Sequence, residues 1–256
     1  GEALLSASAR GWDGSDNSMV VSGSMPRGSA RRIFAPFAGA PSEFALMFSE
    51  ELEANGFEIE EVAPGDAPDQ PGLRTVSEIR SDELSSILCD MNKWSMNGVA
   101  EQVLRTAGLA AAGEPVTTAA ACDLVGAMLR RLTPGCASFQ LADGSGLSRL
   151  NRLSPANLAA VVAAGACSIE WGPEFIASLA VNGVDGTLRS RLSDLPPGAF
   201  RGKTGTLSDT CALAGVVFTS SGKRLAVAIL AETPPGEVYA AKDWQDGVIR
   251  ALYSGV

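Results

Sequence analysis

The sequence predicts an α+β fold in which helices cover an antiparallel sheet. Residues 81–180 hold a succession of segments with apolar residues at helical spacing, and residues 199–232 hold three consecutive apolar runs rich in strand-forming residues. Another segment with helical spacing, 236–255, follows them. Strands that follow one another directly, with helical segments on both sides in the chain, are typical of an antiparallel sheet packed against helices.

Capping residues and breakers set the bounds that we expect for the helices of residues 81–180. The expected segments are 81–94 with Ser81 as N-cap, 97–108 ending at Gly108, 117–132 stopped by Pro134-Gly135, 154–165 with Ser154 as N-cap and Pro155 at its first position, and 173–180. The last helix of the chain is expected to bury one apolar face, made of Val238, Ala241, Trp244, Val248 and Leu252.

The three strand-like runs are 199–207, 212–220 and 224–232. A short segment, Ser220-Ser221-Gly222-Lys223, separates the last two runs and predicts a hairpin turn.

The first part of the chain is less regular. Residues 1–36 are turn-rich with a short strand, and the literal Ser15-Asp16-Asn17 there is interpreted as a coincidental turn. A helix is expected from Ser42, as its cap, to Asn55-Gly56. The Pro-, Gly- and Asp-rich stretch 62–73 is the best candidate linker, so the predicted division is 1–73 and 74–256.

Charge and hydropathy exclude two classes of function. The net charge is −9 and no cluster of lysine and arginine is present, so nucleic-acid binding is not expected. The longest apolar stretch, 157–166, is about half as long as a membrane span requires. The N-terminus has no basic start and no long apolar run, so it is not a signal peptide; either the protein is cytosolic or a leader has been removed.

The sequence of 256 residues contains no histidine. This excludes Ser-His-Asp and Cys-His catalysis within the chain and removes the commonest zinc ligand. The five cysteines show no C-x-x-C spacing, so neither a metal nor another cofactor is expected. Small buried thiols are the favoured interpretation of the cysteines, and the spacing leaves open whether any are bridged.

Two short motifs carry residues suited to chemistry. Lys203-Thr204-Gly205, followed by Thr206, lies in an expected strand. There the lysine supplies charge, the threonine hydroxyls can hold a carboxylate, and the glycine lets a substrate lie along the backbone. Ser95-Met96-Asn97 lies in a break between two helices, where a hydroxyl and an amide can face a cleft. K-T-G occurs beside S-D-N and S-x-x-K in β-lactamases and penicillin-binding proteins.

Four blocks in this order, 91–108, 141–158, 179–192 and 200–217, resemble the penicillin-binding D-alanyl-D-alanine carboxypeptidases of the low-molecular-mass class with inserted accessory domains. The resemblance covers residues 75–256, and residues 1–74 look like the end of that family's accessory domains. It implies a β-lactamase/transpeptidase-like fold. It also implies action on peptidoglycan stem peptides ending in D-Ala-D-Ala, or on their cross-links, through a serine acyl-enzyme that β-lactams would also form, outside the cytoplasmic membrane.

The resemblance implies a role for each matching residue. Asn97 would hold the substrate amide, Ser95 would relay a proton to the leaving group, and Lys203 would set the electrostatics of that relay. Thr204 and Thr206 would grip the terminal carboxylate beside Gly205, and the Thr206 N–H would form half of an oxyanion hole. Two further assignments come from the residues themselves. Asp143 and Ser145 could line the cleft, although packing a tight glycine turn is favoured, and Arg201 is expected to be a solvated strand residue.

The family's nucleophile, the serine of an S-x-x-K helix, has no good counterpart. The one literal match, Ser220 to Lys223, falls in the expected hairpin turn rather than on a helix. The first strands and the nucleophile helix of the fold are therefore expected to be absent from this chain. That absence would expose an apolar face and an unpaired strand edge, so we expect self-association or association with an N-terminal segment.

Three readings of the function remain open at this point. The favoured one is part of a larger carboxypeptidase, because the relay residues are intact. The others are a noncatalytic protein that binds muropeptides or a partner protein, and a true β-lactamase.

Overall fold

The computed structural model describes residues 4–9, 19–28, 40–63, 74–75, 77–136, 138–234 and 237–255. The chain divides into two compact units, Gly1–Ile79 and Arg80–Val256. The Ser15-Asp16-Asn17 turn and most of the linker 62–73 lie outside the described residues. The assignment of 1–73 to an accessory domain stays a prediction.

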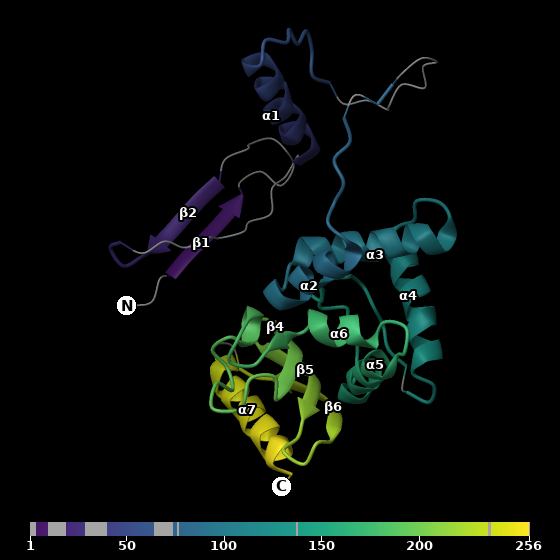
Figure 1. The fold of residues 1–256 in the computed structure, drawn as a ribbon, viewed down its shortest axis with the longest axis vertical. Helices are drawn as coiled ribbons and strands as arrows, with labels where there is room; N and C mark the ends of the chain where they lie inside the picture. Colours follow the sequence, from purple (N-terminus) through teal and green to yellow (C-terminus); the bar gives the residue numbers. More distant parts are fainter. Residues whose placement is uncertain are drawn as a thin grey trace. The chain divides into compact units, whose positions relative to one another are not determined.

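The first unit contains a two-stranded ribbon and one helix. Strands β1 (Leu4–Ala9) and β2 (Met19–Ser24) pair antiparallel, and α1 spans Ala40–Ala54 (Figure 1). The predicted cap at Ser42 is wrong, because the helix begins two residues earlier and Ser42 lies in its first turn. The predicted end at Asn55-Gly56 is confirmed, and Gly56 has the positive φ (+88°) that favours glycine after a helix.

The second unit confirms the predicted α+β class. Its elements are α2 (Leu84–Trp94), α3 (Asn97–Ala112), α4 (Thr118–Leu132), α5 (Pro155–Cys167), α6 (Gly172–Ser178), β3 (Ala180–Val181), the 3₁₀ turn η1 (Gly186–Leu188), β4 (Phe200–Thr206), β5 (Thr210–Phe218), β6 (Arg224–Glu232) and α7 (Val238–Ser254).

The sheet of this unit has the order β3-β4-β5-β6, with every pair antiparallel. The three predicted strands and the turn at 220–223 are confirmed, whereas the short β3 was not predicted. Because β3 pairs only with Arg201 and Gly202, the segment from Lys203 to Thr206 has β5 on one side and no described strand on the other. That segment therefore offers a free backbone edge.

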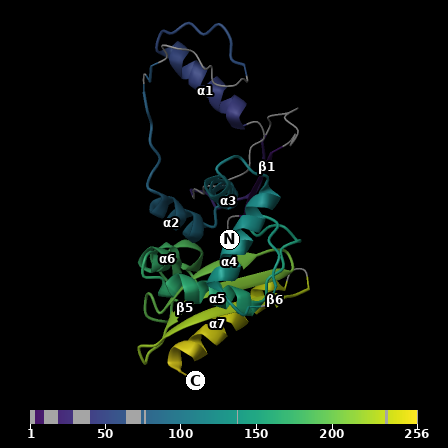
Figure 2. The same cartoon turned by 90° about the vertical axis from the view of Figure 1, so that its right-hand side faces the viewer.

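Helices cover both faces of the sheet. Helix α7 lies on one face, and α5 and α6 lie on the other (Figures 1 and 2). Phe200, Leu213 and Val217 from the strands pack with Ile249 of α7 in the main core. The prediction that Trp244 belongs to the buried face of α7 is wrong: its side chain is 59% exposed, because the packed face runs through Ile249 instead.

Two predicted helix bounds are wrong for a visible reason. Gly108 does not end α3 but is buried inside it, because a Cβ there would lie 2.7 Å from the Cβ of Ala121 on α4, and the helix continues to a C-cap at Gly113. Ser81 does not cap α2, since its hydroxyl donates to the neighbouring Asp82 carbonyl. The predicted cap of α5 at Ser154 is confirmed.

All five cysteines are free thiols. Cys122 and Cys211 are buried, as expected of small apolar side chains, whereas Cys167 is exposed and contradicts that expectation. Among the helices in the described ranges, none has both the length and the apolar character required to cross a bilayer.

Candidate active site

The sharp corner between α2 and α3 sets the position of Ser95. The residue follows the last turn of α2 with left-handed backbone angles (φ 57°, ψ 53°), which are uncommon for a residue other than glycine. The N–H groups of Ser95 and Met96 both donate to the carbonyl of Met91 and so satisfy the end of the helix. Asn97 is then the first residue of α3, two positions beyond the serine.

Lys203 connects this corner to the sheet. Its Nζ donates to Ser95 Oγ over 2.7 Å and to the carbonyl oxygen of Thr204 over 2.6 Å. No ion pair of this lysine with a carboxylate occurs among the described residues. Burial lowers the pKa of Lys203 from its ordinary value, because a desolvated ammonium is disfavoured. The structure thus places a half-buried cation directly against a serine hydroxyl.

The other predicted site residues lie around this pair. The Asn97 side chain is exposed and makes no hydrogen bond to any described residue, so its amide is free for a ligand. Gly205 and Thr206 are exposed at the end of β4, where the backbone edge is free. Thr204 is half-buried, and its Oγ1 donates to Thr187 Oγ1 over 2.8 Å.

The sequence analysis missed the loop that holds the corner and the strand together. Asp185 Oδ2 accepts from Lys93 Nζ over 2.6 Å, and its Oδ1 accepts from the Val181 N–H over 2.7 Å. Burial alone would raise the pKa of Asp185, but the hydrogen bonds from Lys93 and Val181 outweigh it and hold that pKa below its ordinary value. The block 179–192 contains this loop, yet its carboxylate has no sequence-level link to a lysine 92 residues away.

Gly186 seats the same loop against α2. A Cβ on Gly186 would lie 2.5 Å from the carbonyl oxygen of Lys93, and φ is +54° there. Only glycine tolerates both conditions without a shift of the backbone. Lys93, two residues before Ser95 in the helix, and Gly186, directly before Thr187 in the loop, are therefore packed closely together.

Asp143 and Ser145 behave as the favoured structural interpretation expects. Asp143 accepts from the N–H groups of Gly146 and Ser148 and from the side chains of Asn151 and Ser145. Burial would raise the pKa of Asp143, but the bonds from Asn151, Ser148, Gly146 and Ser145 lower it overall. The carboxylate is thus committed to its own turn.

This turn also contacts α3 and the end of the sheet. The N–H groups of Gly144 and Ser145 donate to Glu101 Oε1 on α3. Arg149, a few residues on, pairs with Asp209 in the turn between β4 and β5 over 2.6 Å. That pair is about half exposed, so it contributes little to stability.

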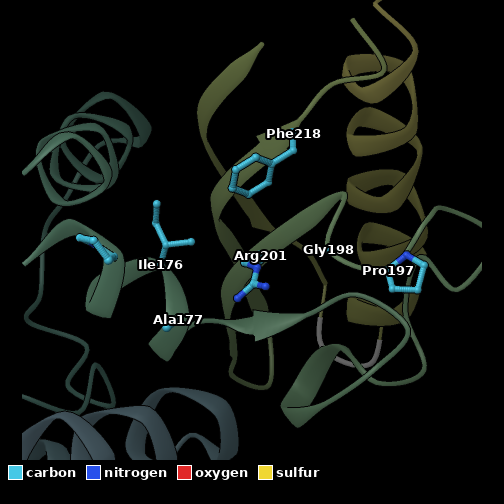
Figure 3. A pocket seen from close by; sticks show the side chains of 7 residues that line it. Ile176, Ala177, Pro197, Gly198, Arg201 and Phe218 are labelled. Carbon is cyan, nitrogen blue, oxygen red and sulfur yellow. The ribbon is translucent and has the colours of Figure 1, made fainter. Parts of the chain in front are cut away.

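A shallow cavity of about 440 Å³ lies beside α6, near the start of β4. Figure 3 shows Ile176 and Ala177 on one side of it, Pro197 and Gly198 on the other, and Arg201 between them. Arg201 lies in a strand as expected, and its half-buried side chain reaches this open cavity without an ion pair to any described residue. None of the predicted site residues lines it. Within the described ranges, no group of three or more Cys, Asp and Glu side chains could hold a metal ion.

The fold defines the class of protein. An antiparallel sheet between helix layers is the architecture that this chain shares with a penicillin-binding protein. The structure aligns with penicillin-binding protein 4 (dacB) of Haemophilus influenzae with a TM-score of 0.75 and 22% identity, over 98% of this chain and 59% of that one. The chain belongs to the D-Ala-D-Ala carboxypeptidase 3 (S13) family, whose model matches residues 10–252.

Two named proteins are similar to this chain in sequence. A D-alanyl-D-alanine carboxypeptidase of Actinomadura sp. (strain R39) is 34% identical over 250 residues, which are 93% of this chain and 46% of the relative. Carboxypeptidase DacB of Mycolicibacterium smegmatis is 33% identical over 191 residues, which are 72% of this chain and 41% of the relative. The chain thus spans less than half the length of these two relatives.

Proposed function

We propose that this chain provides the substrate-recognising part of a serine-type D-Ala-D-Ala carboxypeptidase of peptidoglycan metabolism, acting through an acyl-enzyme. The observation that supports the proposal most is the 2.7 Å hydrogen bond from Lys203 to Ser95 Oγ, formed by a cation without a carboxylate partner among the described residues. A lysine held only for structure would more commonly pair with a carboxylate.

The proposed chemistry begins with a nucleophilic serine that attacks the carbonyl carbon of the penultimate D-Ala. A C–O bond forms, the C–N bond to the terminal D-Ala breaks, the departing amine takes a proton, and the proton that the nucleophilic serine loses restores the one that the relay gives up. Because Lys203 donates to Ser95 Oγ, the hydroxyl proton of Ser95 is free to move to that amine, and a proton from Lys203 can take its place on Ser95. Burial lowers the pKa of Lys203, which makes its ammonium a better proton donor in this exchange. Water then cleaves the acyl-enzyme.

Substrate binding in this proposal uses the free edge of β4. The peptide would lie along the backbone beside the exposed Gly205, as an added strand. The hydroxyls of Thr204 and Thr206 would hold the terminal carboxylate, Asn97 would hold the peptide amide, and the Thr206 N–H would contribute to an oxyanion hole. A β-lactam would occupy the same places.

We propose that the nucleophile does not belong to this chain. Ser220, in the literal S-x-x-K, lies in the hairpin turn after β5, where its N–H donates to the carbonyl of Tyr253. In the β4–β5 register Lys203 faces Ala214, six residues before Ser220, which is about 20 Å along a strand. Ser220 is too far from Lys203 to share an active site with it.

Labelled penicillin followed by intact-mass measurement tests the proposal. We expect no covalent adduct on the chain alone and an adduct on the added segment when an N-terminal family segment carrying S-x-x-K is supplied. With that segment, Lys203→Met should abolish the adduct, whereas Lys223→Met should not. An adduct on the chain alone that Ser220→Ala removes would contradict the assignment of the nucleophile. Reversible peptide binding without an adduct under either condition would favour a noncatalytic, muropeptide-binding protein.

Location and association follow as parts of the same proposal. Peptidoglycan lies outside the cytoplasmic membrane, so the protein would act there. Within the described residues β6 pairs with β5 on one side only, which leaves a nine-residue strand edge. Self-association, or association with a further segment through this edge, stays a prediction.

A further inference from the structure

Thr187 contacts the K-T-G strand at a point that the proposed roles leave unexplained. It lies in η1, half-buried, and its Oγ1 accepts the hydrogen bond that Thr204 Oγ1 donates over 2.8 Å. Thr204 is one of the two threonines proposed to hold a substrate carboxylate. The residue that shares its proton therefore affects what Thr204 can offer to a ligand.

The position of Thr187 is fixed from two directions. Asp185, two residues before it, is bonded to Lys93 at the end of α2 and to the N–H of Val181 in β3. Gly186, its neighbour, is packed against the carbonyl of Lys93. Lys93 itself is two residues before Ser95, so the loop that carries Thr187 is anchored to the same corner that carries the relay serine.

The protons of the two hydroxyls can be accounted for one by one. Each hydroxyl has one proton, and the bond from Thr204 to Thr187 uses the proton of Thr204. No described residue accepts the proton of Thr187. The pair thus retains a single free O–H donor, and it belongs to Thr187. A carboxylate ligand accepts such donors strongly, because hydrogen bonds to an ionised acceptor exceed neutral ones.

We propose that Thr187 is a further substrate-binding residue, whose hydroxyl donates to the terminal carboxylate of the D-Ala-D-Ala peptide beside Thr206. This inference rests on the proposed function and deepens it. Thr204 then acts on the carboxylate through Thr187, to which its own proton is bonded, so recognition extends to a residue outside the K-T-G strand that the Asp185–Lys93 ion pair holds in place.

The test compares two ligands and three variants of this chain. The probe is an N-acylated tripeptide ending in D-Ala-D-Ala, titrated by NMR as the free acid and as the C-terminal amide. We expect the wild-type chain to prefer the acid. Thr187→Val should weaken acid binding about ten-fold and change amide binding less than two-fold, because one hydrogen bond to a charged group is lost. Thr187→Ser should restore most of the acid binding, and Thr118→Val on α4 should leave both unchanged.

The outcomes separate this inference from the proposed function. If the wild-type chain does not prefer the acid, the proposed function fails. If it does, but Thr187→Val keeps the same acid-to-amide ratio, the inference alone fails. It also fails if Thr187→Ser binds no better than Thr187→Val, since the hydroxyl would then not be the relevant group. Should Thr187→Val not fold, the comparison of Thr187→Ala with Thr187→Ser answers the same question.

Discussion

The second unit contains two Asp-Gly turns, at Asp143 and at Asp185, and they use their carboxylates in opposite ways. Asp143 directs both oxygens to its own turn, with all four partners within eight residues of it. Asp185 instead accepts one local N–H and then pairs with Lys93, 92 residues away. The first carboxylate shapes a turn, and the second positions one part of the site relative to another.

The difference shows that the local sequence of an Asp-Gly turn does not reveal whether the turn holds parts of the site together. Gly144, directly after Asp143, also packs against a helix, so the two turns differ at a glycine with positive φ: Gly146 has open space where a Cβ would be, whereas Gly186 has the backbone of α2 in contact. Gly146 is required by conformation alone, and Gly186 by conformation and packing together.

The largest expected effect separates these two glycines. Gly186→Ala should destabilise the chain by about 3 kcal/mol, because a left-handed alanine costs about 1 kcal/mol or more and the clash with the carbonyl of Lys93 adds about 2 kcal/mol. Gly146→Ala should cost about 1 kcal/mol, the conformational part alone. Urea unfolding monitored by circular dichroism measures both.

Equal losses for the two alanine variants would break the comparison. They would show that the loop of Gly186 moves away from α2 without resistance, so that its packing does not hold the corner. Gly222→Ala, at another open positive-φ position in the β5–β6 turn, is a matched control and should resemble Gly146→Ala.

A smaller effect distinguishes the two carboxylates. Asp143→Asn should lower stability by about 2 kcal/mol, because at least one of its hydrogen-bond donors would face an amide NH₂ instead of an acceptor. Asp185→Asn should lower stability by about 1 kcal/mol but weaken binding of the D-Ala-D-Ala acid several-fold, since Thr187 loses its anchor. Urea unfolding and the peptide titration report the two quantities separately. A fall in peptide affinity for Asp143→Asn but not for Asp185→Asn would reverse the assignment.

The sequence predicted the elements whose signals are local. Strands β4, β5 and β6, the hairpin turn at 220–223 and the N-cap at Ser154 follow from composition and spacing within a few residues. The meeting of Lys203 with Ser95 was expected only through the motifs and the family resemblance, because 108 residues separate the two in the chain. Their roles in catalysis stay predictions.

What the sequence did not predict depends on contacts between distant segments. Gly108 looked like a helix end because glycine is usually unfavourable inside a helix, yet here α4 packs directly against it. Trp244 looked like a core residue from its spacing alone, but Gln245 and Ile249 of α7 are buried instead. Thr187 and Asp185 carried no local signal, since their partners, Thr204 and Lys93, lie in other elements.

The smallest expected effect concerns acid and salt. The pKa values of Asp143 and Asp185 are both lowered in the folded chain, so as pH falls the unfolded state takes up protons first. Their stabilisation is therefore complete above pH of about 5 and is lost as pH falls through the folded values.

At pH 7, 0.5 M NaCl should reduce the loss caused by Asp185→Asn by a few tenths of a kcal/mol, because salt screens the ion pair with Lys93. It should leave the loss caused by Asp143→Asn unchanged, since the donors there are neutral. Urea unfolding from pH 3 to 7, with and without salt, checks both expectations, and equal salt sensitivity of the two variants would contradict the distinction between a local and a long-range carboxylate.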